Sequence, residues 1–182
     1  WDGFVYHMTS RGSRFNPMSG GAPGKDSPEW LHTTTKNMRN FIRKWGTVVK
    51  HDEFMKPIVV PKYDFGFIVK NANLGLLQSL EPFCSTIYVD TYAEDYINVE
   101  QPNTLYDLTK RIYSIDAEKQ NDIEIRFDGS ELTNKSFQII QQLPEILVNE
   151  EQLEEGSFVL DIFEITINSV KTYEGGLIKC EY

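Results

Sequence analysis

Residues 64–90, DFGFIVKNANLGLLQSLEPFCSTIYVD, decide the fold class of this chain. The run Asp64–Lys70 is rich in apolar, β-forming residues and predicts a buried strand. Asn73–Pro82 carries leucines at helical spacing behind an Asn suited to a helix N-cap, and Ser85–Asp90 predicts a second strand. Strand, helix and strand in this order predict a βαβ unit with parallel strands and a right-handed connection.

The chain after this unit continues with segments of both kinds. Asp122–Asp128 alternates apolar and charged residues, which predicts a strand with one wet face, and Ser157–Asn168 has the apolar character of a central strand. The other segments are predicted as a loop (Thr91–Asn103), a helix (Thr104–Tyr113), a helix restarted at Pro144 (Leu132–Leu153) and a last edge strand (Ser169–Tyr182). We therefore expect an α/β (α+β) fold with a mixed sheet, and alternation alone leaves ferredoxin-like and doubly wound strand orders open.

The chain before this unit predicts a strand, a loop and a helix. Gly3–Met8 suits a short strand, and the Gly, Ser and Pro content of Thr9–Asp26 predicts a surface loop. A helix is expected from Ser27 as N-cap to Gly46 as C-cap. Its apolar positions predict a core-facing stripe that includes Leu31, Thr34, Met38, Phe41 or Ile42, and Trp45. Pro57 and Pro61 then bracket a connector, so we expect two domains, residues 1–56 and 57–182.

Composition indicates an ordinary globular protein. Of the 182 residues, 40% are hydrophobic and 25% are charged, and no apolar run approaches the length of a membrane span. No signal peptide is visible, and two cysteines, Cys84 and Cys180, impose no disulfide framework. We expect a cytoplasmic location. Because Trp1 opens the chain inside a predicted strand, we also expect the chain to be a fragment of a longer polypeptide.

Charge is distributed unevenly along the chain. Residues 1–56 hold nine basic and five acidic side chains, a net charge of +4, whereas residues 57–182 carry −13, within a total of −9. Such an asymmetry favours an anionic ligand or partner for the first segment and a solvated surface for the second. The cations of the predicted helix fit nucleic acid, anionic lipid or nucleotide equally well, and a merely solvated face is the simpler alternative.

The first segment also collects the residues suited to small-molecule chemistry. His7 ends the predicted strand, and a neutral imidazole binds divalent metals. Arg11 and Arg14 follow in a loop with Ser10 and Ser13, and guanidinium groups bind phosphate oxygens in a bidentate manner. The simpler reading of a lone His is a hydrogen-bonded structural residue. Acidic pairs further along lack metal-site spacing, and no phosphate-binding Gly loop or nucleophile elbow is present.

Two stretches of this segment resemble the closing part of the catalytic domain of family 2 glycosyltransferases, which have the GT-A fold. They are Val5-Tyr6-His7-Met8-Thr9-Ser10-Arg11-Gly12-Ser13-Arg14-Phe15, followed by Trp30, and Asn40-Phe41-Ile42-Arg43-Lys44-Trp45-Gly46. The versions in phage and marine bacterial sequences are especially similar. The match covers about a quarter of the chain. The Asp-x-Asp metal motif and the acidic catalytic base of such enzymes have no counterpart in these residues.

This resemblance implies a strand–loop–helix remnant of a GT-A domain, with residues 57–182 as an accessory domain. His7 would be a metal ligand, and Arg11, Arg14, Ser10, Ser13 and Trp30 would bind substrate; the catalytic residues stay unknown. The parent enzyme would be a hexosyltransferase-like enzyme that moves sugar from a nucleotide-sugar donor to a glycan or other hydroxyl acceptor, with Mn²⁺ or Mg²⁺.

On this resemblance the fragment would be inactive alone. We also expect no membrane span and no specific nucleic acid, and homo-oligomerisation stays open. The alternative is a non-catalytic binding or assembly module that docks an anionic partner through the basic helix. A viral origin is one option for such a module.

Overall fold

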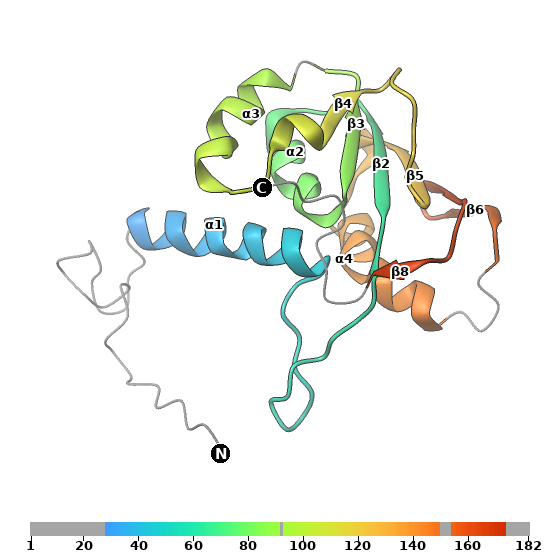
Figure 1. Cartoon of the computed structure of the whole chain (residues 1–182), viewed down its shortest axis with the longest axis horizontal. Helices are drawn as coiled ribbons and strands as arrows, with labels where there is room; N and C mark the ends of the chain where they lie inside the picture. The colour runs from blue at the N-terminus through green and yellow to red at the C-terminus, as the bar shows by residue number, and fades with distance from the viewer. Residues whose placement is uncertain (1–27, 92, 150–153, 174–182) are drawn as a thin grey trace. The chain divides into compact units, whose positions relative to one another are not determined.

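The computed structural model describes residues 28–91, 93–149 and 154–173 (Figure 1). The predicted strand Gly3–Met8 and the loop Thr9–Asp26 lie outside these ranges. The chain divides into two compact units, Trp1–Met38 and Arg39–Tyr182. The first unit is described only as the beginning of helix α1 (Pro28–Trp45), and the end of this helix belongs to the second unit. The predicted domain boundary at residues 56 and 57 stays a prediction.

The second unit is a mixed α/β structure, which confirms the expected fold class. Its six-stranded sheet has the order β4-β3-β2-β5-β7-β6, and a separate pair joins β1 to β8. The strands are β1 (Lys62–Tyr63), β2 (Phe65–Lys70), β3 (Thr86–Val89), β4 (Ile112–Ser114), β5 (Ile123–Asp128), β6 (Gly156–Leu160), β7 (Phe163–Ile167) and β8 (Thr172–Tyr173). The helices after α1 are α2 (Leu74–Leu80), α3 (Glu94–Glu100), α4 (Asn134–Asn149) and the 3₁₀ turns η3 (Glu81–Phe83), η4 (Gln101–Asn103), η5 (Leu108–Lys110) and η6 (Gly129–Glu131).

The predicted βαβ unit is confirmed. Strands β2 and β3 are parallel, with Phe67 opposite Ile87, and helix α2 connects them. The side chain of Asn73 caps this helix by accepting a hydrogen bond from the Leu76 backbone N–H at 3.0 Å. Strands β4 and β5 extend the parallel part of the sheet, whereas β7 and β6 are antiparallel to their neighbours. In the parallel part the strands lie in the order β4-β3-β2-β5. The chain therefore adds strands on one side of β2 first and then crosses to its other side, so the order reverses between β2 and β5.

The helices and one face of the sheet share a single hydrophobic core. Inward residues of β2, β3, β5 and β7 pack with residues of α2, α3 and α4 and with Ile42 of α1. On the opposite face, the connection between β4 and β5 covers the sheet: Lys119 Nζ lies 5.3 Å from the Tyr88 ring centroid, and Asn121 accepts hydrogen bonds from Thr86 and Tyr88. The fold therefore has helices on one face and an irregular crossover on the other.

Three predicted elements are wrong. The predicted loop Thr91–Asn103 contains α3 and η4, and the predicted helix Thr104–Tyr113 is the short turn η5 followed by strand β4. The predicted central strand Ser157–Asn168 is a hairpin, because Asp161 adopts a positive φ of 56° and turns β6 back into β7. Helix α4 also runs through Pro144 instead of restarting there.

The end of helix α1 buries only part of the predicted apolar face: Ile42, one of the two alternatives at that position, is in the core. Gly46 caps it as expected, with a φ of 76° and its N–H donating to Ile42 O at 2.6 Å. Its buried residues are Ile42 and Arg43, whereas Phe41 and Trp45 remain 36% and 39% exposed. The prediction that Trp45 belongs to the core is therefore wrong. None of the helices in the described ranges is long and apolar enough to cross a membrane.

Candidate functional site

Five of the six predicted site residues lie outside the described residues: His7, Ser10, Arg11, Ser13 and Arg14. The sixth, Trp30, is half-buried in the first turn of α1, within the first unit.

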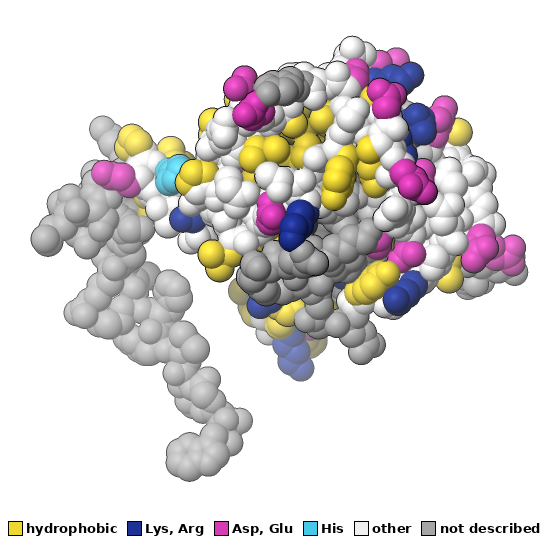
Figure 2. All heavy atoms as spheres, turned by 45° about the horizontal axis from the view of Figure 1, so that its top comes forward, with side chains coloured by type: hydrophobic (Ala, Val, Ile, Leu, Met, Phe, Trp, Pro, Cys, Tyr) yellow, Lys and Arg dark blue, Asp and Glu magenta, His cyan; other side chains and the backbone are white. Residues whose placement is uncertain are grey.

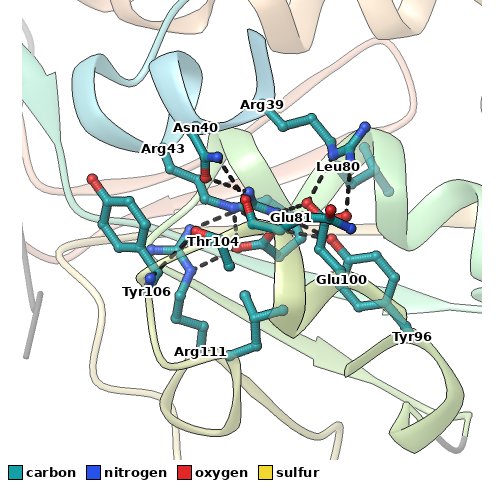
Figure 3. Close-up of polar contacts among 12 residues, drawn as sticks. Arg39, Asn40, Arg43, Leu80, Glu81, Tyr96, Glu100, Thr104, Tyr106 and Arg111 are labelled. Atoms are coloured by element: carbon teal, nitrogen blue, oxygen red, sulfur yellow. Dashed lines mark hydrogen bonds and ion pairs between the residues drawn. The ribbon is translucent and has the colours of Figure 1, made fainter. Parts of the chain in front are cut away.

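The second unit contains a buried cluster of charges that the sequence did not reveal (Figure 3). We call it the ion cluster, and it comprises Arg39, Arg43, Glu81, Glu100 and Arg111. Its members come from the end of α1, from η3, from the end of α3 and from the residue before β4. Three guanidinium groups face two carboxylates, so the cluster has a formal charge of +1.

Arg43 is the centre of the ion cluster. Its Nη2 lies 2.6 Å from Glu81 Oε2 and 2.8 Å from Glu100 Oε1, and its Nη1 donates to Asn40 Oδ1 at 2.9 Å. Arg39 binds the same Glu100 in a bidentate manner, with Nε and Nη2 at 2.8 and 2.7 Å from the two carboxylate oxygens. Two consecutive turns of α1 are therefore tied to α3 and η3.

Arg111 and Tyr96 complete the coordination of Glu81. Arg111 Nε donates to Glu81 Oε1 at 2.7 Å, and its Nη2 donates to the carbonyl oxygens of Glu81 and Cys84 at 3.2 and 2.6 Å. The Tyr96 hydroxyl donates to Glu81 Oε2 at 3.0 Å. The carboxylate of Glu81 thus accepts hydrogen bonds from three side chains, which compensates its removal from water.

Electrostatics keep both carboxylates ionised. Burial alone raises the pKa of Glu81, but the charges of Arg111 and Arg43 and their hydrogen bonds outweigh it and hold that pKa below its usual value. At Glu100, burial likewise raises the pKa, and hydrogen bonds from Arg39 and Arg43 outweigh it. Burial is the main cause that raises the pKa of Tyr96, and the negative charge of Glu81 raises it further. The phenol therefore keeps its proton and donates a hydrogen bond.

The ion cluster is placed to hold structure together. The side chains of Arg43 and Glu81 are fully buried, and those of Glu100 and Arg111 almost so. Buried ion pairs of this kind fix the arrangement of the elements that carry them, because breaking one leaves an uncompensated charge. Arg39 and Arg43, which the sequence suggested as cations for an anionic partner, are therefore engaged inside the protein.

A second place of interest is the carboxyl edge of the parallel strands, where open α/β sheets bind ligands at the point of strand reversal. Here that point lies between β2 and β5. Asn71 donates from its side chain to Asp128 at 2.8 Å and from its backbone to Asp90 at 2.7 Å. A Cβ on Gly129 would lie 2.9 Å from Leu76, so η6 packs closely against the start of α2. Asp90 and Asp128 thus hold Asn71 at this point, and their two carboxylates would repel a phosphate.

Beside it, the ends of β3 and β4 border a cleft of about 610 Å³. Buried apolar side chains, including Val89 and Ile112, line it together with exposed Asp90, Glu94 and Asp116. Figure 2 turns this edge toward the viewer and shows acidic side chains around apolar ones. Carboxylates accept hydrogen bonds from hydroxyl or ammonium groups, so the cleft does not suit the diphosphate of a nucleotide sugar. In the part of the chain that the structure describes, no group of three or more His, Cys, Asp or Glu side chains could hold a metal ion.

A third feature is an apolar groove of about 270 Å³ at the end of α1. Phe41 and Trp45 form one side of it, and the segment from Thr47 to Val60 forms the other. That segment doubles back on itself, with His51 paired to Pro57 and the N–H of Ile58 donating to Lys50 O at 2.9 Å. The end of α1 therefore has one face bound by the ion cluster and another face that is apolar and exposed.

Comparison of this chain with models of protein families, with curated proteins and with solved structures finds no match.

Proposed function

We propose that this chain is the C-terminal part of a sugar-transferring enzyme, in which the end of α1 connects the catalytic domain to a non-catalytic α/β domain. The resemblance of Asn40 to Gly46 to family 2 glycosyltransferases motivates the proposal. The observation that carries it is the division of this helix end into two faces. On one face, Arg43 binds Glu81 of the α/β unit. On the other face, Phe41 and Trp45 are partly exposed to solvent.

An exposed apolar helix face is typical of a surface that packs against further protein. In the proposed enzyme, that further protein is the remainder of the catalytic domain. The apolar positions Phe41 and Trp45 would complete its core, while the ion cluster holds the helix from the other side. The α/β unit would act as a support for the catalytic domain.

The charges of the α/β unit also support a donor site outside this unit. Its carboxyl edge presents Asp90 and Asp128 where a doubly wound domain would receive a nucleotide phosphate. We infer that the nucleotide-sugar donor binds elsewhere, at the predicted residues His7, Arg11 and Arg14, with Ser10, Ser13 and Trp30 nearby. A divalent cation held with the help of His7 would stabilise the departing diphosphate.

The alternative function, docking of an anionic partner by the basic helix, depends on the same cations. Arg39 and Arg43 are bound to carboxylates, so within the second unit the end of α1 offers Lys44 to such a partner. Lys44 lies 5.0 Å from the centroid of the Trp45 ring. A partner bound by so few cations would bind weakly, and the salt dependence of its binding would be in proportion to their small number.

Calorimetric titration tests the proposal. A nucleoside diphosphate with Mn²⁺ is titrated into the natural polypeptide that carries this chain, as wild type, as His7→Ala and as the control His51→Ala. The proposal predicts binding that is lost in His7→Ala and retained in His51→Ala. Absence of binding, or equal binding by both variants, contradicts it. Salt-sensitive binding of generic polyanions that ignores His7→Ala would favour the docking module.

A further inference from the structure

Among the residues that the structure describes, strand β6 (Gly156–Leu160) forms one edge of the six-stranded sheet, and its sequence, GSFVL, contains no charged residue and no proline. Phe158 and Val159 are 42% and 71% exposed. Natural sheets protect their edges with lysines, prolines, bulges or very short strands, because a free edge can pair with another strand. The opposite edge, β4, follows this rule with only three residues. Strand β6 does not.

The hairpin geometry tells which backbone groups of β6 face outward. Leu160 pairs with Phe163 across a two-residue turn, so this closing pair exchanges hydrogen bonds with β7. By alternation Phe158 and Gly156 also bond to β7, and the N–H and C=O groups of Ser157 and Val159 point to the free edge. The side chains of Ser157 and Thr166 meet at 3.1 Å, as expected for a closely spaced pair without backbone bonds.

The surroundings of β6 are acidic. Glu154 and Glu155 precede the strand, Asp161 follows it, and Glu164 lies opposite Val159 on β7. The sequence has no Lys or Arg from Glu154 to Val170. A second copy of this chain, paired edge to edge and antiparallel, would bring the acids at one end of each strand against those of the other. Charge complementarity instead favours a strand with basic ends.

We propose that β6 accepts an added β-strand from a partner protein, in the form of an extended segment with β-branched residues in its middle and Lys or Arg at both ends. The backbone of Ser157 and Val159 supplies the hydrogen bonds, and Phe158 and Val159 supply apolar contacts on the two faces. Glu154 and Glu155 at one end of β6 and Asp161 at the other bind the basic ends. This inference is independent of the proposed sugar-transfer function.

The test uses a fluorescent peptide, Lys-Lys-Thr-Val-Thr-Val-Lys-Lys, and the full chain as wild type, Val159→Pro and Val159→Thr. Proline at this position removes an outward N–H and leaves the bonds to β7 intact, and threonine keeps both the N–H and the branched shape. We expect anisotropy to report binding that weakens at least about tenfold in Val159→Pro and less than about threefold in Val159→Thr. A version with Glu in place of each Lys should also bind at least about tenfold more weakly.

A second measurement uses only the wild-type chain, so it does not depend on whether Val159→Pro folds. The same peptide with alternate backbone nitrogens methylated cannot pair as a strand, and we expect it to lose binding to the wild-type chain. Equal binding of the methylated and unmethylated peptides overturns the proposal, as does equal binding of the acidic version. A wild-type dimer in sedimentation that Val159→Pro dissociates would overturn it as well, because the edge would then belong to a second copy.

Discussion

The guanidinium of Arg43 lies 2.6 Å from the carboxylate of Glu81, and both side chains are fully buried. This pair joins the end of a helix to a 3₁₀ turn that is 38 residues away in sequence. Because charge is costly to bury, such a pair persists only when hydrogen bonds satisfy both partners, as Glu100, Arg111 and Tyr96 do here. The relationship explains why the end of α1 belongs with the α/β unit.

Replacement of Glu81 tests how much this pair contributes to the free energy of unfolding. Glu81→Gln leaves Arg43 and Arg111 buried with less compensation, so we expect the free energy of unfolding to fall by about 3–5 kcal/mol. The control is Glu145→Gln, which breaks the half-exposed pair with Lys50 and should cost less than about 1 kcal/mol. Urea unfolding followed by circular dichroism measures both. Similar losses for the two variants would contradict the role of the ion cluster.

The ion cluster also predicts the response to acid. The pKa values of Glu81 and Glu100 lie below the ordinary value of 4.5 in the folded chain, so the carboxylates contribute stability above that pH. This stability is lost as the pH falls below 4.5 and through the lowered folded values. The free energy of unfolding, measured from pH 7 to pH 3, should therefore fall less steeply in Glu81→Gln than in the wild type. Parallel curves for the two proteins would show that Glu81 does not titrate as described.

The buried charges of the ion cluster also limit how much of the fold can be predicted from the sequence. The βαβ unit and strand β5 follow from apolar patterns that the structure confirms. The prediction fails where charged residues occupy buried positions: Arg43 takes a core position in α1, and Glu100 does so in α3. Hydrophobic periodicity assigns such residues to the surface, so it places Trp45 in the core in place of Arg43 and predicts a loop in place of α3. The signal available was Glu81, an acid inside the apolar run from Leu80 to Phe83.

The turn of the β6–β7 hairpin escapes sequence prediction for a different reason. Asp161 adopts a left-handed conformation without glycine or asparagine, and its side chain accepts a hydrogen bond from Ser136 at 2.6 Å. Asp tolerates a positive φ, so Asp161 is a local turn signal, but it is a single residue within an apolar run, and its tertiary contact with Ser136 stabilises the turn. Apart from Trp30, the candidate site of the first segment lies outside the described residues, so its prediction stands on residue chemistry and on the resemblance.

Gly66 predicts a sharp steric effect on the other face of the sheet. A Cβ at this position would lie 2.3 Å from Asn121 Oδ1, the atom that accepts hydrogen bonds from Thr86 and Tyr88. Gly66→Ala should therefore cost at least about 1–3 kcal/mol by overpacking. Gly75→Ala is the matched control: its Cβ meets its nearest neighbour at 3.4 Å, and alanine favours a helix by about 1 kcal/mol. Thermal melts that move in the same direction for both variants would refute this assignment.

Cys84 predicts low thiol reactivity in the folded chain. The side chain is buried, and burial raises the pKa of its thiol well above the usual value. In a Cys180→Ser variant, where Cys84 is the sole thiol of the sequence, we expect a disulfide reagent at pH 8 to label the protein only as it unfolds. Labelling at the rate of a free cysteine in the absence of denaturant would show that this part of the core is open.

Hydrogen exchange at the backbone amides of residues 40–46 tests the central claim most directly. If the ion cluster fixes the end of α1, these amides exchange as slowly as those of β2 and β5 in the wild type. In Glu81→Gln they should lose protection by a larger factor than β2 and β5 do. Exchange of residues 40–46 that is fast in the wild type, or that changes in Glu81→Gln only as much as the sheet does, would contradict the account.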